Sequence, residues 1–184
     1  VFGGYCLFDE MLGNGDHVRP AYQDYKDWLD GEDVKRLHRK SAEAEAFFRK
    51  TGITFNVYGQ DEADERLIPF DVVPRVLSAR EWRKLSKGIE QRVRAINAFL
   101  YDIYHRQEIL PQMIGVNPPG GIYTHIIGTD IVRTGDEEFY VLEDNARTPS
   151  GVSYMLENRE TMLQMFPELF AKIKVQEVSN YPGQ

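Results

Sequence analysis

Two acidic side chains and an amide are spaced in this sequence so that they could bind one metal ion. Glu143 and Asn145 lie two residues apart in an expected strand, and alternate side chains of a strand point to the same face. A turn with Gly135-Asp136 at its centre predicts an antiparallel hairpin in which Asp130 faces Val141. Asp130 is then diagonal to Glu143, with about 7–8 Å between the backbone positions. These oxygen donors suit Mg²⁺ or Mn²⁺, and because magnesium commonly adds phosphate oxygens to one or two carboxylates, a phosphorylated ligand is expected.

The register of this hairpin decides whether the three side chains can meet. An odd number of loop residues would turn Asp130 to the opposite face and separate it from Glu143. The alternative interpretation is that Asp130, Glu143 and Asp144 are solvated charges at the edge of a hairpin, which suits acidic residues in an acidic chain.

The residues after the expected strand add a cation and a flexible turn. Arg147 has a planar donor group that suits phosphate or carboxylate, and its alternative role is an ion pair with Asp144 or Glu143. The turn at residues 149–151 can bring backbone amides close to an anion. Ser150 or Ser153 could instead cap the following helix.

Helices and short strands are expected to position this hairpin. Ser78 and Glu81 have the spacing of a capping box, and apolar residues from Trp82 to Ile103 repeat every three or four positions, which predicts a helix with a buried stripe. Arg159 falls on the apolar side of a helix that follows Gly151, from where it could reach the metal cluster. Further helices are predicted at residues 20–29, 33–50 and 167–174, and strands at residues 53–57 and 67–77.

Several motifs resemble those of one enzyme family. The run EDNARTPSGVSY at residues 143–154, preceded by Asp130, resembles the metal-binding segment of circularly permuted ATP-grasp ligases, the group that includes glutathionylspermidine synthase. Other segments are similar to the type 2 subfamily, so that the resemblance covers nearly the whole chain. These segments are residues 8–12, 19–20, 54–58, 68–75, 155–159 and 166–170.

The resemblance implies an α+β (mixed α/β) fold, the N-terminal portion of a circularly permuted ATP-grasp fold whose antiparallel hairpin carries the metal ligands. Residues 1–116 would form a mixed helix and strand region on the substrate side. Residues 117–184 would hold the hairpin and the following helices, with the nucleotide-binding remainder outside this chain. The implied activity is an ATP- and Mg²⁺-dependent ligase that acts through an acyl phosphate. Its substrates would be a small-molecule or peptide carboxylate and an amine, in a glutathionylspermidine synthase-like or peptide-forming reaction.

The resemblance also implies roles for individual residues. Asp130, Glu143 and Asn145 match the magnesium ligands, and Arg147 would stabilise the transferring phosphoryl group or the acyl phosphate. Ser150 and Gly151 would lie near the phosphate or the substrate.

The chain departs from family members at two places. Gly128 stands where glutathionylspermidine synthases carry an arginine, two positions before the metal-binding aspartate. Family members also carry a longer connection near residues 110–111.

Composition narrows the function classes. The 184 residues carry a net charge of −7 and no run of lysine or arginine, which argues against a nucleic-acid partner. Cys6 is the single cysteine, so the chain has no internal disulfide and suits a reducing compartment. No apolar run reaches transmembrane length and no signal peptide precedes it, so we expect a cytoplasmic protein without a membrane partner.

Two other functions are compatible with the same residues. A metal-dependent hydrolase could use Glu143 or Asp144 as its base, and it would turn over without ATP. A noncatalytic binding module could keep an ATP-grasp-like fold, and neither magnesium nor ATP would then affect its stability.

Overall fold

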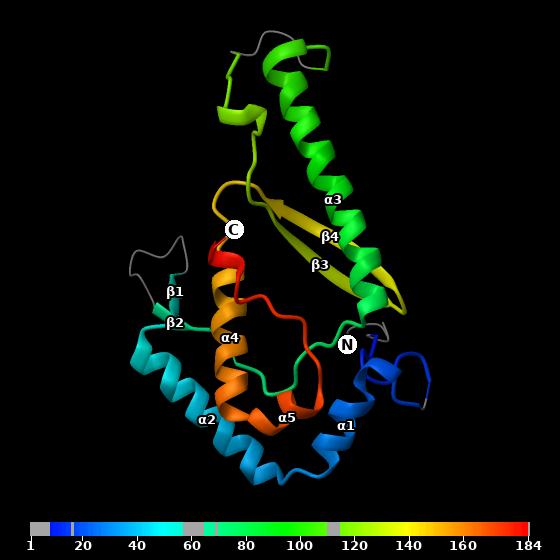
Figure 1. Ribbon diagram of the computed structural model, residues 1–184, viewed down its shortest axis with the longest axis vertical. Coiled ribbons are helices and arrows are strands. Elements are labelled where there is room, and N and C mark those ends of the chain that lie inside the picture. Colours follow the sequence, from blue (N-terminus) through cyan, green and yellow to red (C-terminus); the bar gives the residue numbers. More distant parts are fainter. Residues whose placement is uncertain (1–7, 16, 57–64, 69, 110–114, 184) are drawn as a thin grey trace, which may run out of the picture. The chain divides into compact units, whose positions relative to one another are not determined.

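The protein combines helices with two small antiparallel sheets, which confirms the predicted mixed α and β fold (Figure 1). The computed structural model describes residues 8–15, 17–56, 65–68, 70–109 and 115–183. Cys6 and the junction at residues 110–111 lie outside these residues. Among the residues described, no helix is both long and apolar enough to cross a bilayer.

The described chain divides into two compact units. The hairpin unit consists chiefly of residues 77–150, and the core unit of residues 17–76 and 151–183. The functional division proposed at residue 117 stays a prediction.

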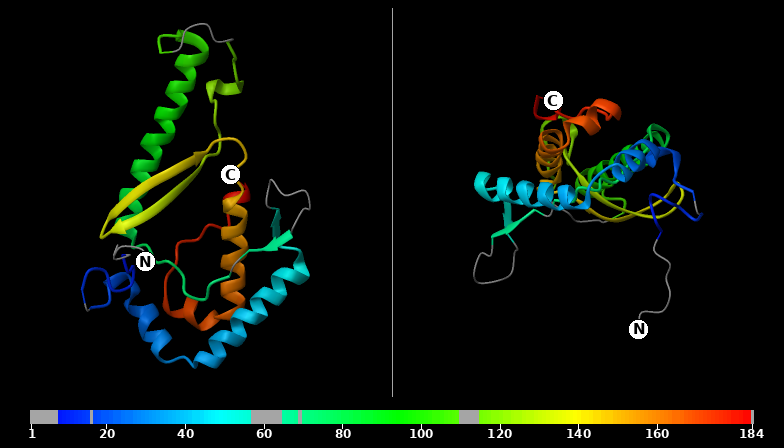
Figure 2. Two further views of the ribbon diagram at one scale, coloured as in Figure 1. Left: turned by 180° about the vertical axis from the view of Figure 1, so that it is seen from behind. Right: turned by 90° about the horizontal axis from the view of Figure 1, so that it is seen from below.

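The core unit is built from helices around a cluster of aromatic side chains. It contains α1 (Gln23–Asp30), α2 (Val34–Thr51), α4 (Gly151–Met165) and α5 (Pro167–Lys172), which Figure 2 shows from two further sides. Trp28 meets Phe166 edge to face at 5.3 Å between ring centroids, and Phe48 meets Phe70 in the same way at 5.7 Å. These contacts join residues far apart in sequence, so the first and last parts of the unit share one core.

The predicted strand at residues 67–77 is wrong for the described residues beyond Leu67. Of these described residues only β2 (Glu65–Leu67) pairs, with β1 (Thr54–Asn56), and Pro74 cannot donate to a ladder. The rest of the segment is held by tyrosine hydroxyls instead. Tyr25 Oη donates to the carbonyl of Val72 at 2.9 Å, and Tyr22 Oη accepts from the amide of Val76 at 2.8 Å.

The hairpin unit consists of one long helix and one hairpin. Helix α3 (Ala79–Tyr101) begins at the predicted capping box: Ser78 Oγ accepts from the amide of Glu81 at 3.2 Å, and the Glu81 carboxylate accepts from the amide of Ser78 at 2.8 Å. A π-helical turn (Asp102–Arg106) continues it. Strands β3 (Gly128–Gly135) and β4 (Glu138–Asn145) follow as an antiparallel pair.

The apolar stripe of α3 is buried less than predicted. Ile103 is buried at 7% exposure, whereas Trp82 is 51% exposed and the stripe residues between them are half-buried. A two-stranded hairpin is too narrow to cover the wide apolar face of a 23-residue helix, which explains the difference.

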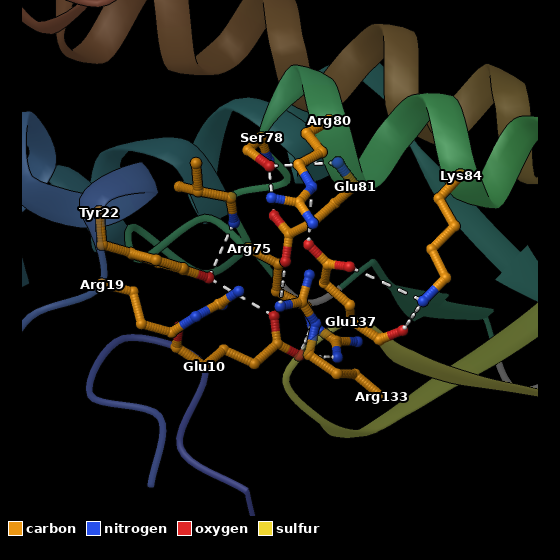
Figure 3. Close-up of polar contacts among 11 residues, drawn as sticks. Glu10, Arg19, Tyr22, Arg75, Ser78, Arg80, Glu81, Lys84, Arg133 and Glu137 are labelled. Atoms are coloured by element: carbon orange, nitrogen blue, oxygen red, sulfur yellow. Dashed lines mark hydrogen bonds and ion pairs between the residues drawn. The ribbon is translucent and has the colours of Figure 1, made fainter. Parts of the chain in front are cut away.

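A buried ion pair joins the start of α3 to the hairpin. Arg133 Nη1 of β3 lies 2.7 Å from Glu81 Oε1, and the two side chains are 1% and 4% exposed (Figure 3). The Arg133 guanidinium also lies 4.7 Å from the centre of the Phe139 ring. Glu81 therefore serves two purposes, because one oxygen completes the helix cap and the other fixes the strand.

Replacing Arg133 by leucine should destabilise the fold by about 3–5 kcal/mol, since the Glu81 carboxylate would stay buried without its cation. Urea unfolding measures the change. The matched control is Arg80→Leu, which removes an exposed ion pair to Glu137 (3.0 Å, Arg80 side chain 80% exposed) and should cost no more than about 1 kcal/mol. Equal losses in the two variants would contradict a special role for the buried pair.

Candidate metal site on the hairpin

Asp130 and Glu143 stand directly opposite each other across the hairpin. The predicted pairing of Asp130 with Val141 is therefore wrong, although the predicted shared face of the two carboxylates is present. The loop consists of Asp136 and Glu137 instead of Gly135-Asp136, because Gly135 pairs with Glu138.

Two register shifts produce this pairing. One lies between Arg133 and Gly135 and adds a residue to β3, and the other lies between Asp130 and Ile131 and adds a residue to β4. Each extra residue alone would reverse the face of every side chain beyond it. Together the two shifts cancel, so Asp130 returns to the face of Glu143.

No cationic side chain of the described residues is paired with either of the two facing carboxylates. Both residues are exposed, and within the described part of the chain neither carboxylate makes a hydrogen bond or an ion pair. Directly opposed side chains in such a pair are roughly 4.5–5.5 Å apart at Cβ, where like charges repel. Two convergent carboxylates are the donor chemistry that a hard divalent cation needs.

Asn145 lies on the same face, opposite Gly128, but its amide oxygen is already engaged. Asn145 Oδ1 accepts from the backbone amides of Arg147 at 3.2 Å and Thr148 at 3.3 Å. This closes the turn that leaves β4. The sequence indicates the right face for Asn145, but not this second use of its oxygen.

Gly128 allows that turn to pack against β3. A Cβ at position 128 would lie 2.9 Å from the Cβ of Pro149 and 3.8 Å from the Cβ of Asn145. The first distance is far inside van der Waals contact, so a side chain here requires the turn to move. The arginine that the resemblance to glutathionylspermidine synthases implies at this point would bring its Cβ into the same overlap with Pro149.

Arg147 is exposed, and its guanidinium makes no hydrogen bond or ion pair with any described residue. The alternative ion pair with a strand carboxylate does not form. Asp144 points to the other face of the hairpin, where it accepts from Arg92 Nε of α3 at 2.6 Å and from Thr129 Oγ1 at 2.9 Å. Arg92 was not indicated by any local sequence pattern, because its partner is 52 residues away.

The remaining candidate residues are distributed over both units. Ser150 ends the hairpin unit, and Gly151 begins α4 in the core unit. Neither Ser150 nor Ser153 makes a capping hydrogen bond among the described residues. Arg159 Nη1 donates to the carbonyl of Gln176 at 3.0 Å, and its guanidinium lies 5.7 Å from the centre of the Phe170 ring, so it is engaged within the core unit.

The donor set of the site is therefore two carboxylates with an amide beside them. Among the described residues there is no group of three or more His, Cys, Asp or Glu side chains placed to hold a metal ion. A cation at this site would complete its coordination with water and ligand oxygens. Magnesium commonly binds in that way, so the residues present fit it.

Comparison with known proteins gives the family. Residues 74–184 match circularly permuted ATP-grasp type 2, and the chain belongs to this family. It is 40% identical to an uncharacterized protein of Synechocystis sp. (97% of this chain, 40% of the relative) and 40% identical to one of Mycobacterium leprae (98% and 36%). A Frankia alni protein provisionally named glutamate–cysteine ligase 2-3 is 35% identical (88% and 20%). The chain thus spans about 40% of the length of the first of these relatives.

Asp130→Asn should have opposite effects without and with magnesium. In EDTA the variant should be more stable than the parent by about 0.2–1 kcal/mol, because the repulsion from Glu143 is removed. With excess Mg²⁺ the parent should gain stability and overtake the variant. Urea unfolding of both proteins in the two buffers measures this reversal. Glu157→Gln, which changes an exposed charge on α4, should show no reversal. A magnesium response that survives in Asp130→Asn would rule out this carboxylate as a ligand.

Gly128→Ala should destabilise the hairpin unit by about 1–3 kcal/mol, because the new methyl group overlaps Pro149. The matched control is Gly88→Ala in α3, where nothing lies within 4 Å of the added carbon and alanine should stabilise the helix by up to about 1 kcal/mol. Urea midpoints of both variants against the parent test the opposite signs. Stabilisation by both substitutions would disprove the steric constraint at Gly128.

Proposed function

We propose that this chain carries the metal-binding part of an ATP-dependent ligase that joins a carboxylate to an amine. The proposal depends on one observation, the facing pair of Asp130 and Glu143 in a chain of the circularly permuted ATP-grasp type 2 family. The Frankia alni relative supports the reaction class, since its name describes the joining of two amino acids.

The proposed reaction has two steps. A carboxylate oxygen of the first substrate attacks the γ-phosphorus of ATP, the bond to the bridging oxygen breaks, and ADP leaves behind an acyl phosphate. The amine nitrogen of the second substrate then attacks the acyl carbon. Inorganic phosphate leaves, the nitrogen loses a proton, and an amide remains.

The residues of the hairpin would bind and orient the reacting groups. Asp130, Glu143 and Asn145 would hold Mg²⁺, or Mn²⁺ in its place, which when bound neutralises phosphate charge. The unengaged guanidinium of Arg147 suits the developing charge on a transferring phosphoryl group. Ser150 and Gly151 are proposed to contact phosphate or substrate, a role that rests on their place in the family motif.

The proposed substrates are a small-molecule or peptide carboxylate and an amine. Glutathionylspermidine formation is less favoured than ligation to an amino acid or peptide, because Gly128 replaces the arginine of glutathionylspermidine synthases and Pro149 occupies its space.

The cytoplasm, which supplies ATP, is the proposed compartment. The hydrolase alternative loses one of its two candidate bases, since Asp144 is paired with Arg92.

Magnesium and an ATP analogue together should stabilise the full-length protein, and Glu143→Gln should abolish the effect. A ligand at about 100 times its dissociation constant adds roughly 2.7 kcal/mol if it binds only the folded state. Thermal unfolding with and without the two ligands measures this gain. Glu160→Gln, an exposed carboxylate of α4, serves as the control and should keep the full response. No stabilisation of a correctly folded parent would favour a noncatalytic module.

A further inference from the structure

The amide oxygen of Asn145 has two uses that exclude each other. It accepts from the backbone amides of Arg147 and Thr148 at 3.2 and 3.3 Å, and a carbonyl oxygen has two lone pairs. Both lone pairs are therefore engaged in the turn. Because Asn145 also lies on the face of Asp130 and Glu143, its oxygen can bind a cation there only by giving up at least one of these hydrogen bonds.

We infer that Asn145 couples cation binding to anion binding at this site. When its oxygen turns to a divalent cation, the amides of Arg147 and Thr148 lose their acceptor and become donors for a phosphate-type anion. Two successive amides in a turn form a concave anion-binding group. The unengaged guanidinium of Arg147 belongs to the same turn. This inference rests on the proposed function, since it requires a cation at Asp130 and Glu143.

The turn should stay in place when Asn145 releases it. Pro149 packs against Gly128 so closely that a Cβ there would lie 2.9 Å from the Cβ of Pro149. This contact involves neither the oxygen of Asn145 nor the two amides. The freed amides therefore remain beside the hairpin instead of moving away with a loosened loop.

The coupling makes the order of ligand binding matter. In the metal-free protein the anion competes with Asn145 for the two amides, whereas in the metal-bound protein it does not. Coupling between two sites is reciprocal, so phosphate should strengthen magnesium binding by the same factor by which magnesium strengthens phosphate binding. A factor of about 5–150 is typical of such coupling.

Amide hydrogen exchange of the full-length protein tests the inference directly. Mg²⁺ alone should accelerate exchange at Arg147 and Thr148 in the parent, because their acceptor is withdrawn. Inorganic phosphate added afterwards should slow exchange again at the same two amides. The ladder amides of Val132 and Tyr140, which pair across the hairpin, should not change and provide the internal reference.

Two variants separate this coupling from simple charge attraction. Asn145→Ala frees both amides permanently, so in EDTA it should bind inorganic phosphate several-fold more tightly than the parent, with a smaller enhancement by Mg²⁺. Asn117→Ala, at an exposed position outside the hairpin, should match the parent.

The outcomes distinguish failure of this inference from failure of the proposed function. Exchange at Arg147 and Thr148 that stays unchanged under saturating Mg²⁺ would overturn the coupling and leave the ligase proposal intact. Weaker phosphate binding by metal-free Asn145→Ala would also overturn it, since Asn145 would then only support the turn. If Mg²⁺ does not bind the parent at all, the proposed function fails and this inference fails with it.

Discussion

The whole site depends on which residue of β4 stands opposite Asp130. Two extra residues, one in each strand, place Glu143 there, and a slip of one position would turn the carboxylates to different faces. An isolated two-stranded ribbon is at best marginally stable in water, so it cannot be relied on to hold such an irregular register. The register has to be imposed from outside the hairpin, and side chains of α3 form ion pairs with both strands.

Two of the ion pairs between helix α3 and the hairpin hold its strands at separate points. Glu81 and Arg92 are eleven residues apart, or about 16 Å of helix, and they bind Arg133 and Asp144. Arg133 is four residues from Thr129, the residue of β3 opposite Asp144, which corresponds to about 13 Å of strand. The two spacings are similar, so both pairs form together in this register. A one-residue slip would move a partner by about 3.3 Å and end one of them.

Local sequence patterns predicted the parts of this arrangement that depend on near neighbours. The capping box at Ser78 follows from the spacing of Ser78 and Glu81, and the shared face of Glu143 and Asn145 follows from strand alternation. The loop was misplaced by one residue, because a glycine-aspartate pair is a strong turn signal and nothing in the sequence marks the extra residues at Thr134 and Leu142. Arg92 and Arg133 each pair with a carboxylate 52 residues away in the sequence. Local spacing patterns of helices and strands do not predict contacts at such a sequence separation. The burial of the apolar stripe of α3 was overestimated, since a periodic pattern shows which side of a helix is apolar but not how much of that side is covered.

The contact between Gly128 and Pro149 also restricts how such a site can change in evolution. The space beside position 128 can hold only one of two groups. It can hold a large cationic side chain of the strand, or it can hold the turn that lies against the strand. A change from the second arrangement to the first requires substitutions at positions 128 and 149, and each substitution alone is harmful. A side chain at position 128 overlaps the turn. A turn displaced by a change at position 149 leaves the strand without a cationic side chain. Positions 128 and 149 are therefore expected to be epistatic, so that the two forms of the site persist as separate lineages with few intermediates between them.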